Sequence, residues 1–237
     1  MGKSLNIADV LDLTVQEALY YFSENKNIVN ALTPLVKVGL NYLKLGQPVP
    51  TLSGGEAQRL KLAKYLIEAA NEAGSKTHKM FVFDEPTTGL HFDDTAKLMS
   101  SLRELVDNGH SVLVVEHNLD VIDGSDWIIE LGPEGGEKGG EELFAGTPDL
   151  FVIKETPTGK ALASYRQALI EKDPTAYFVN APTEETEIAE QYPKDAISIV
   201  NAREHNLKNL SLTIPRNKFT VAVSYTHLRA HETRHDL

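Results

Sequence analysis

Two adjacent acids, Asp84 and Glu85, stand at the end of the apolar run in FVFDEPTTGLH, residues 81–91. A buried strand that ends in carboxylates is a common way to hold Mg²⁺ and a water molecule beside a nucleotide phosphate. In that chemistry Asp84 would hold the metal, directly or through water, and Glu85 would orient or deprotonate the attacking water. A pair of exposed acids at a strand end is the alternative that this segment leaves open.

Two further segments carry residues that suit phosphate chemistry. In LSGGEAQR, residues 52–59, the N–H groups of Gly54 and Gly55 and the hydroxyl of Ser53 open a helix and would favour an anion. The same residues also form an ordinary turn. In VLVVEHN, His117 follows an apolar run, where its imidazole would either hydrogen-bond a γ-phosphate and the water or have a structural role.

The elements that must position these residues alternate between strands and helices, which is typical of an α/β domain with a parallel sheet. Apolar periodicity predicts a first helix over 6–23, capped by Asp9 or Thr14, and a helix that Ser53 opens and that ends near Gly74. The continuous run at 79–85 predicts a strand covered on both faces. The later elements are expected at 93–109 (helix), 111–118 (strand), 119–125 (helical turn), 126–132 (strand) and 141–148 (strand).

In their order and spacing, the three motifs resemble the back half of an ABC-type ATPase, with a signature loop, a Walker B strand and a switch histidine. The amino-acid sequences of the motifs resemble those of the UvrA family, specifically its C-terminal ATPase half. Glu56 after the signature glycines separates the chain from transporter ATPases, which tend to have glutamine there. The resembling segments are LSGGEAQRLKLA, DEPTTGLHFDD, VVEHNLDVI, DWIIELGPEGGEKGGEELFAGTP and NIADVLDLTVQEAL. The resemblance covers residues 4–165, with a second match over 196–224.

This resemblance implies an α/β, ABC-type P-loop NTPase fold that is incomplete here. It contains the helical part with the signature and the Walker B half of the sheet, followed by the opening β-strands of a second module. The implied divisions are a helical lead-in (1–50), the back half of the ATPase (51–165), a linker (166–195), the opening strands of a further module (196–224) and a non-native tail (225–237).

The resemblance also implies site roles and partners. Residues 87–91 would link two composite ATP sites. The parent protein would recognise damaged DNA in nucleotide excision repair, with an opposing ATPase half or a second UvrA-like subunit and a UvrB-like partner. The implied roles are water activation (Glu85), γ-phosphate sensing (His117), Mg²⁺ binding (Asp84) and contact with the γ-phosphate of ATP held mainly by the opposing half (Ser53, Gly54 and Gly55).

The chain departs from the family pattern in what surrounds these motifs. No complete GxxxxGK[ST] phosphate loop occurs, and MGKS at the start has only Met1 before Gly2, so we expect the isolated fragment to be inactive as an ATPase. Zinc is expected in the parent, but the absence of cysteine leaves no thiolate ligands here. The final stretch, YTHLRAHETRHDL, resembles translated adapter sequence, with a short exposed tail as the alternative.

Bulk composition narrows the class of protein. The 237 residues carry a formal net charge of −11, which argues against a stand-alone nucleic-acid binder. No apolar run approaches the roughly 20 residues of a membrane span, and no secretory signal is visible, so we expect a cytoplasmic protein without membrane contact. Two alternatives remain: an ATP-responsive ABC interaction module that does not hydrolyse ATP, and a drug-resistance or transport ABC ATPase.

Overall fold

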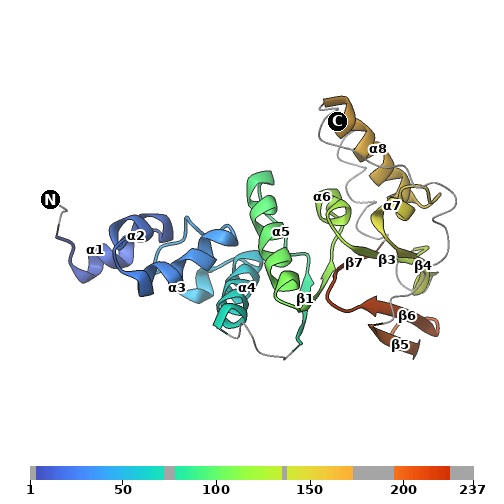
Figure 1. Cartoon of the computed structure of the whole chain (residues 1–237), viewed down its shortest axis with the longest axis horizontal. Coiled ribbons are helices and arrows are strands. Elements are labelled where there is room, and N and C mark those ends of the chain that lie inside the picture. The colour runs from blue at the N-terminus through green and yellow to red at the C-terminus, as the bar shows by residue number, and fades with distance from the viewer. Residues whose placement is uncertain (1–3, 72–77, 135–137, 173–194, 225–237) are drawn as a thin grey trace. The chain divides into compact units, whose positions relative to one another are not determined.

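The computed structural model describes residues 4–71, 78–134, 138–172 and 195–224 (Figure 1). The chain divides into a helical unit, from 1–77 and 86–108, and a sheet unit, from 78–85 and 109–237. Each unit is described by itself. Helices and a largely parallel sheet confirm the predicted α/β class.

The first predicted helix is two helices, α1 (Ile7–Asp12) and α2 (Val15–Tyr21). Each begins with its own capping box, α1 at Asn6 and α2 at Thr14. Thr14 was one of the two predicted caps, whereas Asp9 accepts the N–H of Asn6 at 3.0 Å and completes the first box. A cap residue takes extended backbone, so Thr14 interrupts the helix that apolar periodicity alone predicts.

Three longer helices form the core of the helical unit. They are α3 (Lys26–Lys37), α4 (Gly54–Asn71) and α5 (Phe92–Asp107), with a single 3-10 turn, η1 (Val49–Thr51), before α4. The three helices contact one another in pairs. The hydroxyl of Ser101 on α5 donates to the carbonyl of Lys37 at 3.0 Å. The buried apolar side chains of the unit include Val15, Ala18, Val38, Leu40, Leu43, Leu62, Ala63, Leu66, Leu98, Leu102 and Leu105.

The sheet unit is built on a five-stranded sheet in the order β1-β2-β7-β3-β4. Its strands are β1 (Met80–Asp84), β2 (Ser111–Val115), β7 (Phe219–Ser224), β3 (Trp127–Gly132) and β4 (Glu141–Gly146). The first four strands run parallel to one another, and β4 at the edge runs antiparallel to β3. Asp84 lies opposite Val115, which lies opposite Ala222. The carboxyl ends of β1, β2 and β7 therefore share one edge of the sheet.

Strand β1 is covered on one face only among the described residues, so the prediction of cover on both faces is wrong for this strand. Phe81 and Phe83 are buried, whereas Val82 is 62% exposed. Successive side chains of a strand point to opposite faces. One row of side chains therefore joins the core, and the other stays at the surface, even though all three residues are apolar.

Residues 196–224, expected as the opening strands of a further module, fold onto this same unit. Strands β5 (Ala196–Ala202) and β6 (Leu210–Pro215) form an antiparallel pair, and β7 enters the main sheet between β2 and β3. The apolar cluster that joins the pair to β3 consists of Trp127, Ile129, Leu210, Leu212 and Ile214. Local alternation predicts such strands, but the sheet they join depends on pairing far along the chain.

Three helices complete the sheet unit: α6 (Leu119–Asp123), α7 (Pro148–Phe151) and α8 (Pro157–Lys172). Arg166 on α8 bonds Asp123 at 2.5 Å and Asp149 at 2.8 Å, which ties α8 to the other two helices. Because α8 runs to Lys172, the first residues of the predicted linker (166–195) are helical.

Two expectations fall largely or wholly outside the described residues. Most of the predicted linker, and all of the tail over 225–237, are among the positions that the structure does not describe. Within the described ranges, no helix has the length and apolar character needed to cross a membrane.

Candidate functional site

The two acids of the opening motif end strand β1 at the edge shared by the parallel strands. Asp84 is the last residue of β1 and is exposed. Glu85 follows with a positive φ of 43°, and its N–H donates to the carbonyl of Val115 at 2.8 Å. A left-handed backbone is costly for a residue other than glycine and is often found at functional sites. The bond to β2 holds that conformation and fixes where the Glu85 side chain starts.

His117 lies beside Glu85. Its Nδ1 is 3.8 Å from Oε1 of Glu85 and 3.8 Å from Oε2 of Glu116. The His117 and Glu85 side chains are 22% and 31% exposed, so both reach solvent. The structure therefore brings together the two residues for which a catalytic role was predicted.

Glu116 is a member of this cluster that the sequence reading did not single out. Its side chain is buried and accepts the N–H of His117 at 2.9 Å and that of Asn118 at 3.1 Å. The carboxylate thereby fixes the turn that carries the imidazole. An acid immediately before the histidine, directly after an apolar strand, was the available signal, but sequence alone does not say which way the side chain turns.

The cluster suits general acid–base chemistry more than a protein-built metal cage. No group of three or more His, Asp and Glu side chains in the described parts of the chain could hold a metal ion. Mg²⁺ commonly takes only one or two protein carboxylates, with water and phosphate oxygens completing its shell. The exposed Asp84 and the neighbouring Glu85 fit that donor set.

The signature segment lies in the helical unit, at the start of α4. Ser53 and Glu56 form a capping box: the Ser53 N–H donates to Glu56 Oε2 at 2.7 Å, and the Glu56 N–H donates to Ser53 Oγ at 3.3 Å. The Ser53 hydroxyl, predicted as an extra donor to an anion, here accepts a hydrogen bond from the helix. Its own proton can still donate.

The two glycines of the signature have different surroundings. A Cβ added at Gly55 would lie 3.0 Å from the carbonyl oxygen of Thr88 and 3.2 Å from Nη1 of Arg59. A Cβ at Gly54 would meet nothing within 4 Å. Packing inside the unit therefore favours a glycine at 55. Thr88, whose carbonyl makes the tighter contact, belongs to the predicted linking loop 87–91. The space around Gly54 leaves its backbone open to an approaching group.

Tyr42 joins the start of α4 to the segment before it, a contact that sequence reading also missed. Its hydroxyl donates to Glu56 Oε1 at 2.6 Å. This bond is the main cause that lowers the pKa of Glu56, followed by the backbone N–H of Ser53. Burial, and then the same bond to Glu56, raise the pKa of Tyr42. The carboxylate is thus held ionised at the start of the helix.

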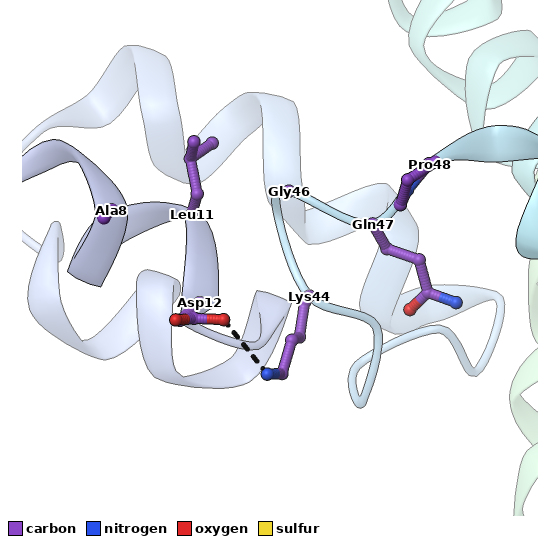
Figure 2. A pocket seen from close by; sticks show the side chains of 7 residues that line it. All are labelled: Ala8, Leu11, Asp12, Lys44, Gly46, Gln47 and Pro48. Carbon is purple, nitrogen blue, oxygen red and sulfur yellow. Dashed lines mark hydrogen bonds and ion pairs between the residues drawn. The ribbon is translucent and has the colours of Figure 1, made fainter.

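A surface pocket of about 420 Å³ lies elsewhere in the helical unit (Figure 2). Its lining comes from α1 and from the turn-containing segment that precedes η1: Ala8, Leu11, Asp12, Lys44, Gly46, Gln47 and Pro48. The Asp12–Lys44 ion pair, at 3.1 Å, crosses it, and the Gly46 N–H donates to the carbonyl of Leu11 at 2.8 Å. The pocket contains none of the predicted site residues.

Comparison with known proteins identifies the family. No protein-family model matches the chain. The UvrABC system protein A of Thermus thermophilus is 56% identical over 162 residues, covering 68% of this chain and 16% of that protein. The same protein of Aquifex aeolicus is 53% identical over 166 residues, covering 69% of this chain and 17% of its own length.

A solved structure agrees with these relatives. The crystal structure of UvrA2 from Deinococcus radiodurans matches with a TM-score of 0.61 and 43% identity, over 69% of this chain and 20% of the other. The chain thus spans about a sixth of the length of the curated relatives it matches. In sequence and in fold, it belongs to the family of UvrABC system protein A, or UvrA.

Proposed function

We propose that this chain supplies the signature and hydrolysis elements of a UvrA-type ATPase that recognises DNA damage in nucleotide excision repair. The observation that carries the proposal is the placement of Glu85 beside His117 at the carboxyl edge of a parallel sheet, with Nδ1 to Oε1 at 3.8 Å. Relatives named UvrABC system protein A favour repair over transport, and the acid next to the histidine favours hydrolysis over a purely structural module.

In the proposed reaction, each residue of the sheet unit has one task. Asp84 would bind Mg²⁺, whose charge would offset that of the ATP phosphates. Glu85 would orient the attacking water and accept its proton. His117 would hydrogen-bond the γ-phosphate, and Glu116 would hold the turn that carries His117 through its two bonds to backbone N–H groups.

The signature elements would act on a nucleotide bound mainly by the opposing ATPase half. The N–H groups of Gly54 and Gly55 lie at the start of an 18-residue helix, where the helix dipole favours an anion. Ser53 would add its hydroxyl. The opposing half, or a second UvrA-like subunit, a UvrB-like protein and damaged DNA are the proposed partners of the whole protein, which we place in the cytoplasm.

A chimeric enzyme tests this proposal, because the isolated chain has no complete phosphate loop. Residues 4–165 would replace the matching segment of the Thermus thermophilus relative, which is 56% identical to this chain over 162 aligned residues. We expect magnesium-dependent ATPase activity, and a fall of kcat by about 100-fold or more with Glu85→Gln, the range typical of a lost general base.

Two controls keep this experiment specific. Glu141→Gln alters an exposed acid at the start of β4 and should leave kcat unchanged. The 237-residue chain alone should hydrolyse ATP no faster than background. A folded chimera whose turnover does not depend on Glu85 would contradict the proposal, as would turnover by the isolated chain.

A further inference from the structure

Arg59, on helix α4, is buried without full hydrogen bonding. Arg59 is 3% exposed, and its Nε and Nη1 atoms have no hydrogen-bond partner among the described residues. Most buried polar groups in proteins are paired, and each exception calls for an explanation. A guanidinium with two idle donors inside a helical unit is therefore an unusual feature of this chain.

The guanidinium lies directly beneath the signature. Helical side chains lean towards the N-terminus, so a residue covers the one that is four positions earlier. The Nη1 atom lies 3.2 Å from where a Cβ of Gly55 would stand. The absence of that Cβ lets the positive charge approach the first turn of α4 from below, while the Gly54 side of the turn stays open.

The guanidinium adds a positive charge beside the first turn of α4, where it interacts with the Tyr42 hydroxyl and the Glu56 carboxylate. A helix N-terminus already carries partial positive charge and destabilises a cation placed near it. Glu56 offsets part of that charge, since Arg59 is among the causes that lower the pKa of the Glu56 carboxyl. That carboxylate is, however, engaged by the Tyr42 hydroxyl and the Ser53 N–H. The idle donors of Arg59 remain beside the turn whose free N–H groups would receive a phosphate.

We infer that Arg59 is a positioning residue of the anion site at the start of α4. Its charge, held beneath Gly55, increases the affinity of the signature turn for a phosphate oxyanion, and its bulk keeps Gly55 against the carbonyl of Thr88. This inference rests on the proposed role of Ser53, Gly54 and Gly55 and assigns a role to Arg59, the last residue of the segment LSGGEAQR.

Inorganic triphosphate, titrated into the ¹⁵N-labelled 237-residue chain, tests the inference. The amide resonances of Gly54 and Gly55 report binding at the turn. We expect Arg59→Gln to weaken the apparent affinity by about tenfold, the size of one charge interaction near a protein surface. Arg59→Lys, which keeps the charge, should stay within about threefold of the original affinity. Lys64→Gln removes an equal charge from an exposed position of the same helix and should change affinity little.

The outcomes separate this inference from the proposed function. If the glycine amides of the original chain do not respond to triphosphate, the anion site itself is refuted, and the role of Arg59 with it. If they respond and Arg59→Gln binds equally well, the anion site stands and the role of Arg59 is refuted. Equal losses in Arg59→Gln and Arg59→Lys would indicate a packing role alone. Circular dichroism would establish that each variant is folded. If Arg59→Gln does not fold, the triphosphate affinity of Arg59→Lys, compared with that of the original chain, decides the role of Arg59.

Discussion

At the residue scale, the turn that carries His117 is held by one buried carboxylate. Glu116 accepts two backbone N–H groups, at 2.9 and 3.1 Å, and its side chain is fully buried. Glu116→Ala would leave both N–H groups without their acceptor and should cost about 1–3 kcal/mol of the free energy of unfolding. Urea unfolding, followed by the fluorescence of Trp127, measures that cost, since Trp127 is the chain's one tryptophan and lies in the same unit.

The conservative variant supplies the control for Glu116. Glu116→Gln keeps one acceptor oxygen at nearly the same place, so it should lose less stability than the alanine variant. If alanine and glutamine variants unfold at the same urea concentration as the original chain, the two bonds do not hold the turn.

Single residues differ in how far sequence could place them. Asp84, Glu85 and His117 were predictable because each follows a run of apolar residues whose strand character is local. Glu116 and Arg59 were not, because their importance lies in which groups their side chains meet, and that depends on backbone geometry after folding. The roles predicted for Asp84, Glu85 and His117 in ATP hydrolysis stay predictions.

At the element scale, the start of helix α4 should respond to pH through Glu56. The Tyr42 hydroxyl, and then the Ser53 N–H, lower the pKa of this carboxyl below its ordinary value of 4.5. A lowered pKa in the folded state stabilises the fold above the ordinary value, and this contribution disappears as the pH falls through the folded value. Glu56→Gln should therefore unfold more easily than the original chain at neutral pH, and the difference should shrink in acid.

Urea unfolding followed by circular dichroism, at about pH 7 and about pH 3.5, measures this dependence. Glu68→Gln is the matched control, because Glu68 lies later in α4 in an exposed ion pair with Lys64 at 3.5 Å. Glu68→Gln should change the free energy of unfolding little at either pH. A stability difference for Glu56→Gln that persists unchanged in acid would show that ionisation of Glu56 does not stabilise the cap.

Elements were predictable where short-range patterns determine them. The helix after the signature and the strands around Asp84 and His117 follow from periodicity and from continuous apolar runs. The break between α1 and α2 was missed because apolar spacing continues through Thr14, while the capping bonds that interrupt the helix leave no trace in that spacing. The exposed Val82 was missed because sequence does not say what covers the second face of a strand.

At the scale of the whole molecule, the sheet unit depends on its most distant strand. Strand β7 separates β2 from β3, and its backbone bonds reach both sides: Lys218 O accepts the N–H of Val112 at 3.0 Å, and Phe219 O accepts that of Asp126 at 2.8 Å. Phe219, Val221 and Val223 are at most 1% exposed. The sequence predicts a further module over this segment, and that division stays a prediction; nothing local reveals the neighbours of a strand in a parallel sheet.

Truncation tests that dependence. A chain that ends at residue 195 lacks β5, β6 and β7, so β2 and β3 lose their shared neighbour and Trp127 loses its contacts with Leu210, Leu212 and Ile214. We expect the emission of Trp127 to shift to longer wavelength and cooperative unfolding of the sheet unit to disappear. A chain that ends at residue 224 keeps every described element and should behave like the original.

A synthetic peptide of residues 196–224 sharpens this test. Added to the shorter chain, it should restore the emission of Trp127, because the strands it carries supply both the missing backbone partners and the apolar cover of β3. The same peptide with Val221→Asp would place a carboxylate at a fully buried position and should fail to restore it. If the shorter chain keeps a buried Trp127 and unfolds cooperatively by itself, β7 is dispensable, and residues 196–224 belong to a separate module after all.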